Sequence, residues 1–186
     1  MYYASTANGL LHNDTISAIT QSAEGRIYVV SEKGVEISDT AQKKFEWHGF
    51  NTTLKQRWTA LENDPFGEKF SIASAPGHRI AMLENDKLTL LDVTNKSART
   101  IILPPRKADA IMGHNNIRVD SRGRFYFEYY GRIYRISEKG ELKLLWEHTG
   151  QPTRISALFI DRSDVLWLSL NAQGLLKIDL KALHFE

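Results

Sequence analysis

Four times along the 186-residue chain, an apolar run meets a short polar corner and is followed by a second aromatic or apolar run. The corners are Ser22–Gly25, Ser74–Gly77, Asp120–Gly123 and Asp161–Asp164. Counted between their last residues, successive corners lie 52, 46 and 41 positions apart. A period of about 40–50 residues, with strand-forming runs on both sides of a corner, is typical of propeller blades. The repeat therefore predicts a β-propeller.

Each unit contains further strand signals after its corner. In the first unit, Arg26–Val30 is rich in β-branched and aromatic residues, and Val35–Ile37 and Lys44–Trp47 alternate. Lys33–Gly34 supplies a turn, because glycine accepts a positive φ at little cost. Four antiparallel strands of this kind make one blade. We therefore predict an all-β fold, a partial (open) β-propeller of about four blades with four antiparallel strands each. The expected blades are residues 8–50, 66–104, 114–148 and 153–186.

Composition limits the classes of function. The chain carries 24 Lys and Arg against 22 Asp and Glu, so a nucleic acid is not expected as its main partner. It has no cysteine, which excludes disulfides, cysteine-bound zinc and thiol catalysis. No apolar run approaches the roughly 18 residues of a membrane span, so no membrane contact by this segment is expected. Met1–Ala4 lacks the features of a signal peptide, and any export signal is expected outside this chain.

The fourth unit carries the fullest version of the repeat. It places Asp161 at the corner, Trp167 between two leucines in the following strand, and Gly174–Leu175 at the next turn. This pattern resembles the two-component regulator propeller repeat, in which an apolar strand, Asp-x-x-Gly, an apolar-Trp-apolar strand and a Gly-Leu turn follow one another. The first unit is similar, with Gly25 at the corner and Tyr28 in place of the tryptophan.

The other two units match that repeat less fully. The third keeps Asp120, Gly123 and Tyr126, whereas the second has Ser74 in place of the aspartate and clearly retains only Gly77. Taken together, the resemblance covers most of the chain. Such repeats occur mainly in the extracytoplasmic sensor region of bacterial hybrid two-component histidine kinases, especially those tied to polysaccharide use.

The resemblance implies a periplasmic propeller that senses an oligosaccharide, or a neighbouring protein domain, and has no catalytic activity of its own. Propellers of this family usually have more than four blades. The resemblance therefore also implies the remaining blades and a downstream signalling domain of the parent protein as partners. An open arc leaves apolar blade faces and strand edges exposed, so a homodimer that covers them is expected.

Two other functions stay open at this point. The repeat also loosely resembles propeller enzymes of the streptogramin-lyase type, which would need histidine and acidic residues converging on one face. The six histidines recur about once per unit, but none lies in a metal or nucleophile motif, so no catalytic residue is predicted. A protein–protein assembly scaffold is the third interpretation, and a stable protein partner without a small ligand would identify it.

Neither a metal nor a cofactor is predicted. Calcium needs several closely spaced oxygen ligands, and no Asp-x-Asp-x-Asp sequence is present. Asp120 and Asp161 are instead expected to cap their corners by accepting hydrogen bonds from backbone N–H groups. Tyr28, Tyr126 and Trp167 are expected to pack in the core, because they occupy the buried second strand of their units.

Aromatic residues near the loops are the candidates for ligand binding. Sugars stack the C–H faces of their rings on aromatic side chains, while planar polar groups orient the hydroxyls. On that basis the candidates are Trp47, His48, Trp58, Tyr129, Tyr130 and Arg132. Packing between neighbouring blades is the alternative role of each aromatic side chain, since such side chains dominate protein cores.

Overall fold

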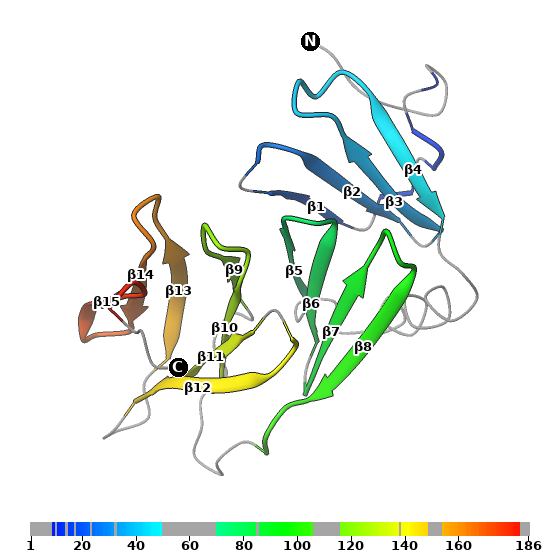
Figure 1. The fold of residues 1–186 in the computed structure, drawn as a ribbon. Coiled ribbons are helices and arrows are strands. Elements are labelled where there is room, and N and C mark those ends of the chain that lie inside the picture. Colours follow the sequence, from blue (N-terminus) through cyan, green and yellow to red (C-terminus); the bar gives the residue numbers. More distant parts are fainter. Residues whose placement is uncertain are drawn as a thin grey trace.

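All regular secondary structure in the described residues is β-strand. The computed structural model describes residues 9, 11–13, 15–16, 18–22, 24–31, 33–49, 70–84, 86–105, 116–137, 139–148 and 154–182. These residues form fifteen strands in four separate antiparallel sheets, and each sheet takes its strands in chain order (Figure 1). The predicted all-β class is confirmed.

The four sheets follow one another along the chain. The first contains β1 (Ala18–Gln21), β2 (Ile27–Ser31), β3 (Gly34–Ser38) and β4 (Phe45–Gly49). The second contains β5 (Phe70–Ala75), β6 (Arg79–Glu84), β7 (Lys87–Asp92) and β8 (Ser97–Ile102). The third contains β9 (Ile117–Val119), β10 (Phe125–Tyr129), β11 (Arg132–Ile136) and β12 (Leu142–Glu147). The fourth contains β13 (Ile155–Ile160), β14 (Val165–Leu170) and β15 (Gly174–Asp179). Residues 183–186 of the fourth expected blade lie outside the described ones.

Successive sheets pack face to face around a row of first strands. β1 lies beside β5, β5 beside β9, and β9 beside β13 (Figure 1). Three apolar clusters fill the spaces between the sheets, one for each pair of neighbours. Their buried members include Tyr28 and Met82 between sheets one and two, Leu83 and Phe127 between two and three, and Tyr126 and Leu168 between three and four. This is the packing of propeller blades in an open series, as predicted.

Strand β10 illustrates why the sequences of these strands are almost continuously apolar. All five of its residues are buried. Phe125, Phe127 and Tyr129 belong to the cluster shared with the second sheet, whereas Tyr126 belongs to the cluster shared with the fourth. Because side chains alternate between the two faces of a strand, a strand covered on both faces needs apolar residues at almost every position.

The corner of the second sheet lies one residue later than the sequence indicated. In the other sheets the corner closes with a backbone hydrogen bond across three intervening residues, as from Asp120 N to Arg124 O. The corresponding pair in the second sheet is Ala75 with Arg79, while Ser74 already pairs within the ladder. The predicted corner at Ser74–Gly77 is therefore wrong by one position. Its physical reason is that His78, like the glycine before it, takes a positive φ and extends the turn.

Candidate functional site

The corner aspartates Asp120 and Asp161 hold the corners together. Asp120 accepts hydrogen bonds from the backbone N–H of Arg122 (3.0 Å) and Arg124 (2.9 Å), from Arg124 Nε (2.6 Å) and from the Tyr126 hydroxyl (3.0 Å). Burial raises the pKa of that hydroxyl, so it stays protonated and donates. The expected capping role of Asp120 is confirmed.

Asp161 repeats this arrangement in the fourth sheet. It accepts from the backbone N–H of Ser163 (2.8 Å) and Val165 (3.1 Å) and from the indole N–H of Trp167 (2.9 Å). The hydrogen bond from Trp167 lowers the pKa of the Asp161 carboxyl, with the two backbone bonds acting in the same direction. In both sheets, the aromatic residue six positions after the corner aspartate thus donates a hydrogen bond to that carboxylate, and these carboxylates have a structural role.

Corner residues also tie neighbouring sheets to each other. The Tyr28 hydroxyl of the first sheet lies 3.4 Å from His78 Nδ1 of the second. Arg79 Nη2 of the second sheet donates to the backbone carbonyl of Gly123 in the third, at 3.2 Å. Asp164 of the fourth sheet accepts a hydrogen bond from the backbone N–H of Ser121. Each pair of neighbouring sheets therefore has a polar contact at the corner end, in addition to its apolar cluster.

Three of the predicted ligand-binding residues meet at the turn between β10 and β11. Tyr129 and Tyr130 contact edge to face, with ring centroids 4.8 Å apart, but Tyr129 is only 4% exposed. Arg132 Nε donates to Glu147 Oε1 at 2.9 Å, and this hydrogen bond raises the pKa of its guanidinium. Tyr130 is half-buried and takes a positive φ of 49° at the turn. Of the three, Tyr129 mainly packs in the core.

The other predicted residues do not join that group. Trp47 and His48 are neighbours in β4, so their side chains lie on opposite faces of the first sheet. Trp47 stacks on His12 with ring centroids 5.1 Å apart, while the His48 ring lies 5.9 Å from that of His78. Burial lowers the pKa of His48. Trp58 lies outside the described residues.

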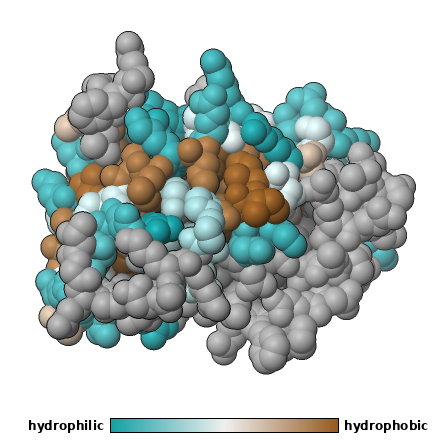
Figure 2. Space-filling model, turned by 90° about the horizontal axis from the view of Figure 1, so that it is seen from below, coloured by the Kyte–Doolittle hydropathy of each residue, from teal (hydrophilic) through white to brown (hydrophobic). Residues whose placement is uncertain are grey.

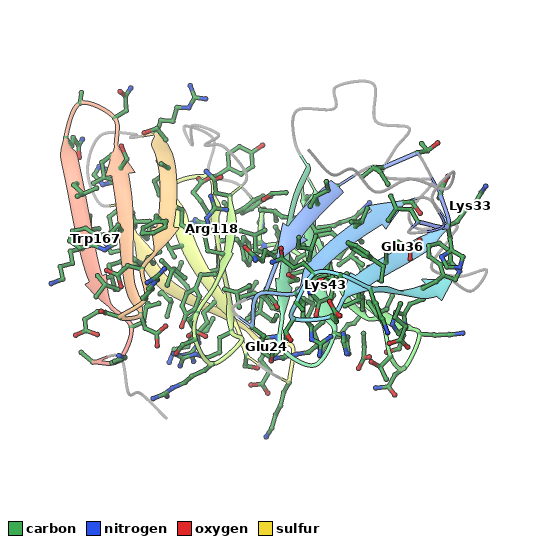
Figure 3. All side chains as sticks on the ribbon, turned by 90° about the horizontal axis from the view of Figure 1, so that it is seen from above. Glu24, Lys33, Glu36, Lys43, Arg118 and Trp167 are labelled. Carbon is green, nitrogen blue, oxygen red and sulfur yellow. The ribbon has the colours of Figure 1, made fainter. Side chains whose placement is uncertain are left out.

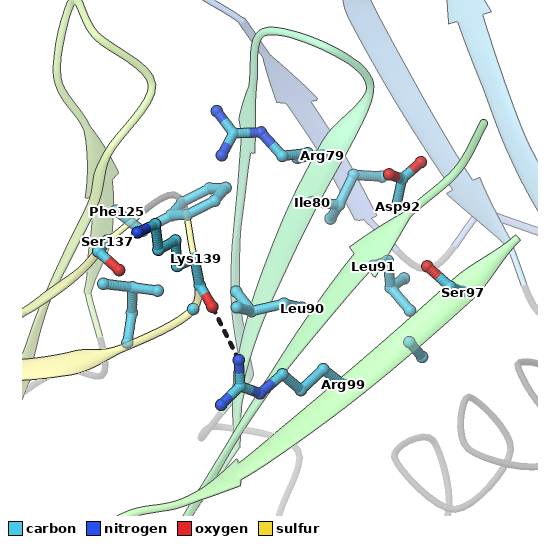
Figure 4. A pocket seen from close by; sticks show the side chains of 13 residues that line it. Arg79, Ile80, Leu90, Leu91, Asp92, Ser97, Arg99, Phe125, Ser137 and Lys139 are labelled. Atoms are coloured by element: carbon cyan, nitrogen blue, oxygen red, sulfur yellow. Dashed lines mark hydrogen bonds between the residues drawn. The ribbon is translucent and has the colours of Figure 1, made fainter. Parts of the chain in front are cut away.

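The structure contains a pocket that the sequence did not indicate. It is a cavity of about 410 Å³ between the second and third sheets, near their corners (Figure 4). This volume is in the range of small-molecule sites. Its apolar wall consists of Ile80, Leu90, Leu91, Phe125 and Ile136, and its polar lining includes Arg79, Asp92, Ser97, Arg99, Ser137 and Lys139.

Backbone carbonyls hold both arginines of this pocket in place. Arg99 Nη1 donates to Lys139 O at 2.8 Å, across from the second sheet to the β11–β12 turn (Figure 4). Arg79 Nε donates to Pro76 O at 3.1 Å, in addition to its contact with the third sheet. Gly140 makes room for Arg99, since a Cβ there would lie 2.7 Å from Arg99 Nη1.

One sheet face of the molecule lacks a described neighbour. On the outer face of the fourth sheet, Trp167 stands in register with Phe159 and Lys177. Figure 3 shows Trp167 at the end of the series of sheets. Phe159 is 57% exposed and Trp167 is half-buried, so the prediction of core packing holds fully for Tyr28 and Tyr126 and only partly for Trp167. Figure 2 shows a second apolar area, a band across the face seen from below.

These features define a β-propeller module of four sheets in series, with structural corner aspartates and a ligand-sized pocket between two sheets. No known protein family matches the chain, and no curated protein matches it. The described residues contain no helix that could cross a membrane.

Solved structures match the fold over most of the chain. Virginiamycin B lyase from Staphylococcus aureus is 15% identical with a TM-score of 0.53, and the match covers 92% of this chain and 58% of that one. Apo AztD from Citrobacter koseri is 16% identical with a TM-score of 0.55, over 90% of this chain and 45% of that one.

A third match is the extracellular domain of a putative one component system from B. thetaiotaomicron. It is 13% identical with a TM-score of 0.50, and the match covers 92% of this chain and 29% of that one. The chain thus spans well under two thirds of each of these structures. At such identities the similarity shows the propeller fold, which is shared by an enzyme and an extracellular domain.

Proposed function

We propose that this chain is a ligand-binding, non-catalytic propeller segment of an extracytoplasmic sensor in a two-component regulatory system. Its proposed ligand is an oligosaccharide, and its proposed partners are further blades and a downstream signalling domain of the parent protein. The resemblance of the fourth unit to the two-component regulator repeat supports this assignment. So does the similarity in fold to the extracellular domain of a putative one component system.

The proposal rests on one observation: the corner carboxylates are engaged in structural hydrogen bonds, whereas the pocket offers polar and apolar groups to a ligand. Asp120 and Asp161 are occupied by hydrogen bonds within their own corners. The cavity between the second and third sheets, in contrast, combines an apolar wall with hydroxyl and guanidinium groups. A convergence of a few polar groups on an apolar cavity is the usual composition of a binding site.

A ligand in this position would act on the packing of two sheets. Because the cavity is lined from both sheets, a ligand that contacts both favours one spacing between them over others. A bias of this kind is sufficient for signalling, and no bond needs to be made or broken in the ligand.

Isothermal titration calorimetry with neutral and acidic oligosaccharides tests the proposal. We expect saturable binding of at least one oligosaccharide, which is recovered unchanged by mass spectrometry. Combined replacement of Trp58, Tyr130 and Arg132 by alanine tests the aromatic candidates, and Arg99→Gln tests the pocket. An unchanged dissociation constant in the triple variant would remove the aromatic candidates from the site. Absence of binding across the whole panel would contradict the proposed function.

An enzyme of the lyase type is the alternative, favoured by the similarity in fold to virginiamycin B lyase. Among the described residues, no cluster of three or more His, Cys, Asp or Glu side chains is placed to hold a metal ion. The discriminating measurement is incubation with streptogramin B or an oligosaccharide, with and without divalent cations. A product that forms only with the cation would establish the enzyme and overturn the sensor proposal.

A further inference from the structure

We propose that the cavity between the second and third sheets binds an organic anion, meaning a carboxylate, sulfate or phosphate group on an apolar or planar body. Arg79 and Arg99 would hold the anionic group, and Leu90, Phe125 and Ile136 would contact the body (Figure 4). This inference rests on the proposed function as a binding module, and it assigns this cavity a ligand class that is tested separately from the oligosaccharide.

The charge of the cavity lining supports an anion. Three cationic residues line it, Arg79, Arg99 and Lys139, against one carboxylate, Asp92. That carboxylate is already engaged by Asn95, whose backbone N–H and side-chain Nδ2 donate to it at 2.9 and 2.7 Å. The ion pairs found among the described residues include neither of the two arginines. The cavity therefore keeps an uncompensated positive charge.

The two guanidinium groups are positioned but not neutralised. Arg99 uses one N–H on Lys139 O, and Arg79 uses two, on Pro76 O and Gly123 O. A guanidinium has five N–H donors, so each arginine keeps donors for an anionic oxygen. Because carbonyl acceptors fix the side chains without cancelling their charge, less conformational entropy is lost when a ligand binds.

Two glycines create the space that the guanidinium groups occupy. Gly123 and Gly140 both have positive φ, at 74° and 77°. A Cβ at Gly123 would lie 2.8 Å from Arg79 Nη2, and one at Gly140 would lie 2.7 Å from Arg99 Nη1. The third sheet thus contributes a glycine surface opposite each arginine of the second. One fixed arginine therefore lies at each end of the cavity, and two fixed cations are suited to hold an anionic ligand.

The apolar wall selects what carries the charge. Ile80, Leu91, Phe125 and Ile136 are buried, so the inner part of the cavity is screened from water. Arg79 is half-buried beside this wall, so its ionic interaction is stronger than in bulk water, whereas the exposed Arg99 is more strongly screened. The apolar wall adds no binding free energy for a small, fully hydrated anion. An anionic group on an aromatic or aliphatic body gains binding free energy from both the arginines and the apolar wall.

Phenyl phosphate is the probe, with inorganic phosphate and benzyl alcohol as the charge-only and body-only controls. Binding to the ¹⁵N-labelled chain is followed by NMR. We expect the largest shift changes at the amides of Ala98, Arg99, Lys139 and Gly140. Phenyl phosphate should bind at least about tenfold more tightly than either control, equivalent to about 1.4 kcal/mol.

Two charge reversals separate the site from a general charge effect. Arg99→Glu should weaken phenyl phosphate binding about tenfold or more. Lys33→Glu changes the net charge equally but lies at the exposed β2–β3 turn of the first sheet, and it should change the affinity less than about twofold. Both replaced side chains are exposed, and thermal unfolding verifies that both variants fold.

Several results would contradict the anion site, and they can be told apart from a failure of oligosaccharide binding. Equal losses in the two variants, equal binding of benzyl alcohol, or shift changes away from the cavity each exclude an anion site there. If Arg99→Glu lost phenyl phosphate but still bound an oligosaccharide normally, the anion site would stand and the oligosaccharide would bind elsewhere. If an oligosaccharide bound and phenyl phosphate did not, the binding function would stand and the anion class would fail.

Discussion

Asp164 in the fourth sheet accepts two hydrogen bonds from Ser121 in the third, one from the backbone N–H at 2.8 Å and one from the hydroxyl at 2.5 Å. Asp164 occupies the corner position that Gly25 and Gly123 hold in other sheets, and it takes a positive φ of 59°. A left-handed backbone is unfavourable for most side chains, although aspartate tolerates it better than most. The contact with Ser121 explains why an aspartate replaces the glycine of the repeat here.

Asp164→Asn is expected to destabilise the chain by about 1 kcal/mol, because the charge-assisted hydrogen bonds to Ser121 become neutral ones. Asparagine also tolerates a positive φ, so the backbone strain is unchanged. Urea unfolding gives the free energy difference. Asp179→Asn is the control, since within the described part of the chain that exposed aspartate accepts hydrogen bonds only from the backbone N–H groups of Lys181 and Ala182. Equal effects of the two substitutions would contradict a role for the contact between sheets.

The same carboxyl group predicts a dependence of stability on pH. Burial raises the pKa of Asp164, but the hydrogen bonds from Ser121 and the charges of Lys181 and Arg124 together outweigh burial, and the net shift is downward. A carboxyl with a lowered folded-state pKa contributes stability above its unfolded pKa of about 3.9, and this contribution is lost as the pH falls through the folded pKa. Unfolding free energies between about pH 5 and pH 2 should therefore fall less steeply for Asp164→Asn than for the unmodified chain. Parallel curves would show that Asp164 does not contribute.

Tyr126→Phe is expected to cost about 1–2 kcal/mol of unfolding free energy, because the buried Asp120 carboxylate loses one of its donors. The ring itself is retained, so the apolar cluster shared with the fourth sheet stays filled. Chemical denaturation measures the difference. The double variant Tyr126→Phe, Asp120→Asn tests the coupling between the two groups, because its loss of unfolding free energy should be smaller than the sum of the two single losses. Additive single effects would indicate that the hydroxyl and the carboxylate act independently.

Gly140→Ala tests the close approach of Arg99. Gly77→Ala is the matched control, because Gly77 has nearly the same φ (75° against 77°) and no heavy atom near the site of a new Cβ. The control should cost about 1 kcal/mol from backbone strain alone. Gly140→Ala should cost more and should also weaken phenyl phosphate binding, since the guanidinium must move. Identical stabilities and affinities would show that Arg99 adapts freely.

The exposed face of the fourth sheet predicts self-association. Phe159 and Leu175 are 57% and 66% exposed there, an arrangement that favours burial against a second copy of the chain. Light scattering over a range of concentrations should detect a dimer. Leu175→Lys should shift it to monomer, whereas Ile19→Lys, on an equally exposed isoleucine of β1, should not. A monomer at all concentrations would exclude dimerisation through this face.

Sequence reasoning located the strands well where glycine and polar corners bracket them. The predicted strands Arg26–Val30, Val35–Ile37 and Lys44–Trp47 differ from β2, β3 and β4 by one or two residues at each end. It failed by one residue at the corner of the second sheet, where His78 takes the left-handed conformation that the pattern assigned to Gly77. A non-glycine residue in that conformation leaves no sequence signal.

The pocket could not be predicted because it depends on which faces of two sheets meet. Arg99 and Lys139 are 40 residues apart, and nothing in the local alternation of either strand indicates that one binds the other. The aromatic candidates share a position near loops in the sequence. That position does not distinguish Tyr129, which packs in a core, from Tyr130, which is partly accessible.

Arg79 has two roles, and they compete. Its guanidinium lines the cavity and also forms the polar contact from the second sheet to Gly123 in the third. A bound molecule that captured this group would weaken the middle link while leaving Tyr28–His78 and Ser121–Asp164 intact. Sheets two and three would stay joined by their apolar cluster and by the hydrogen bond from Ile117 N to Ser71 Oγ, so occupancy of the cavity would loosen their contact at the corner end alone.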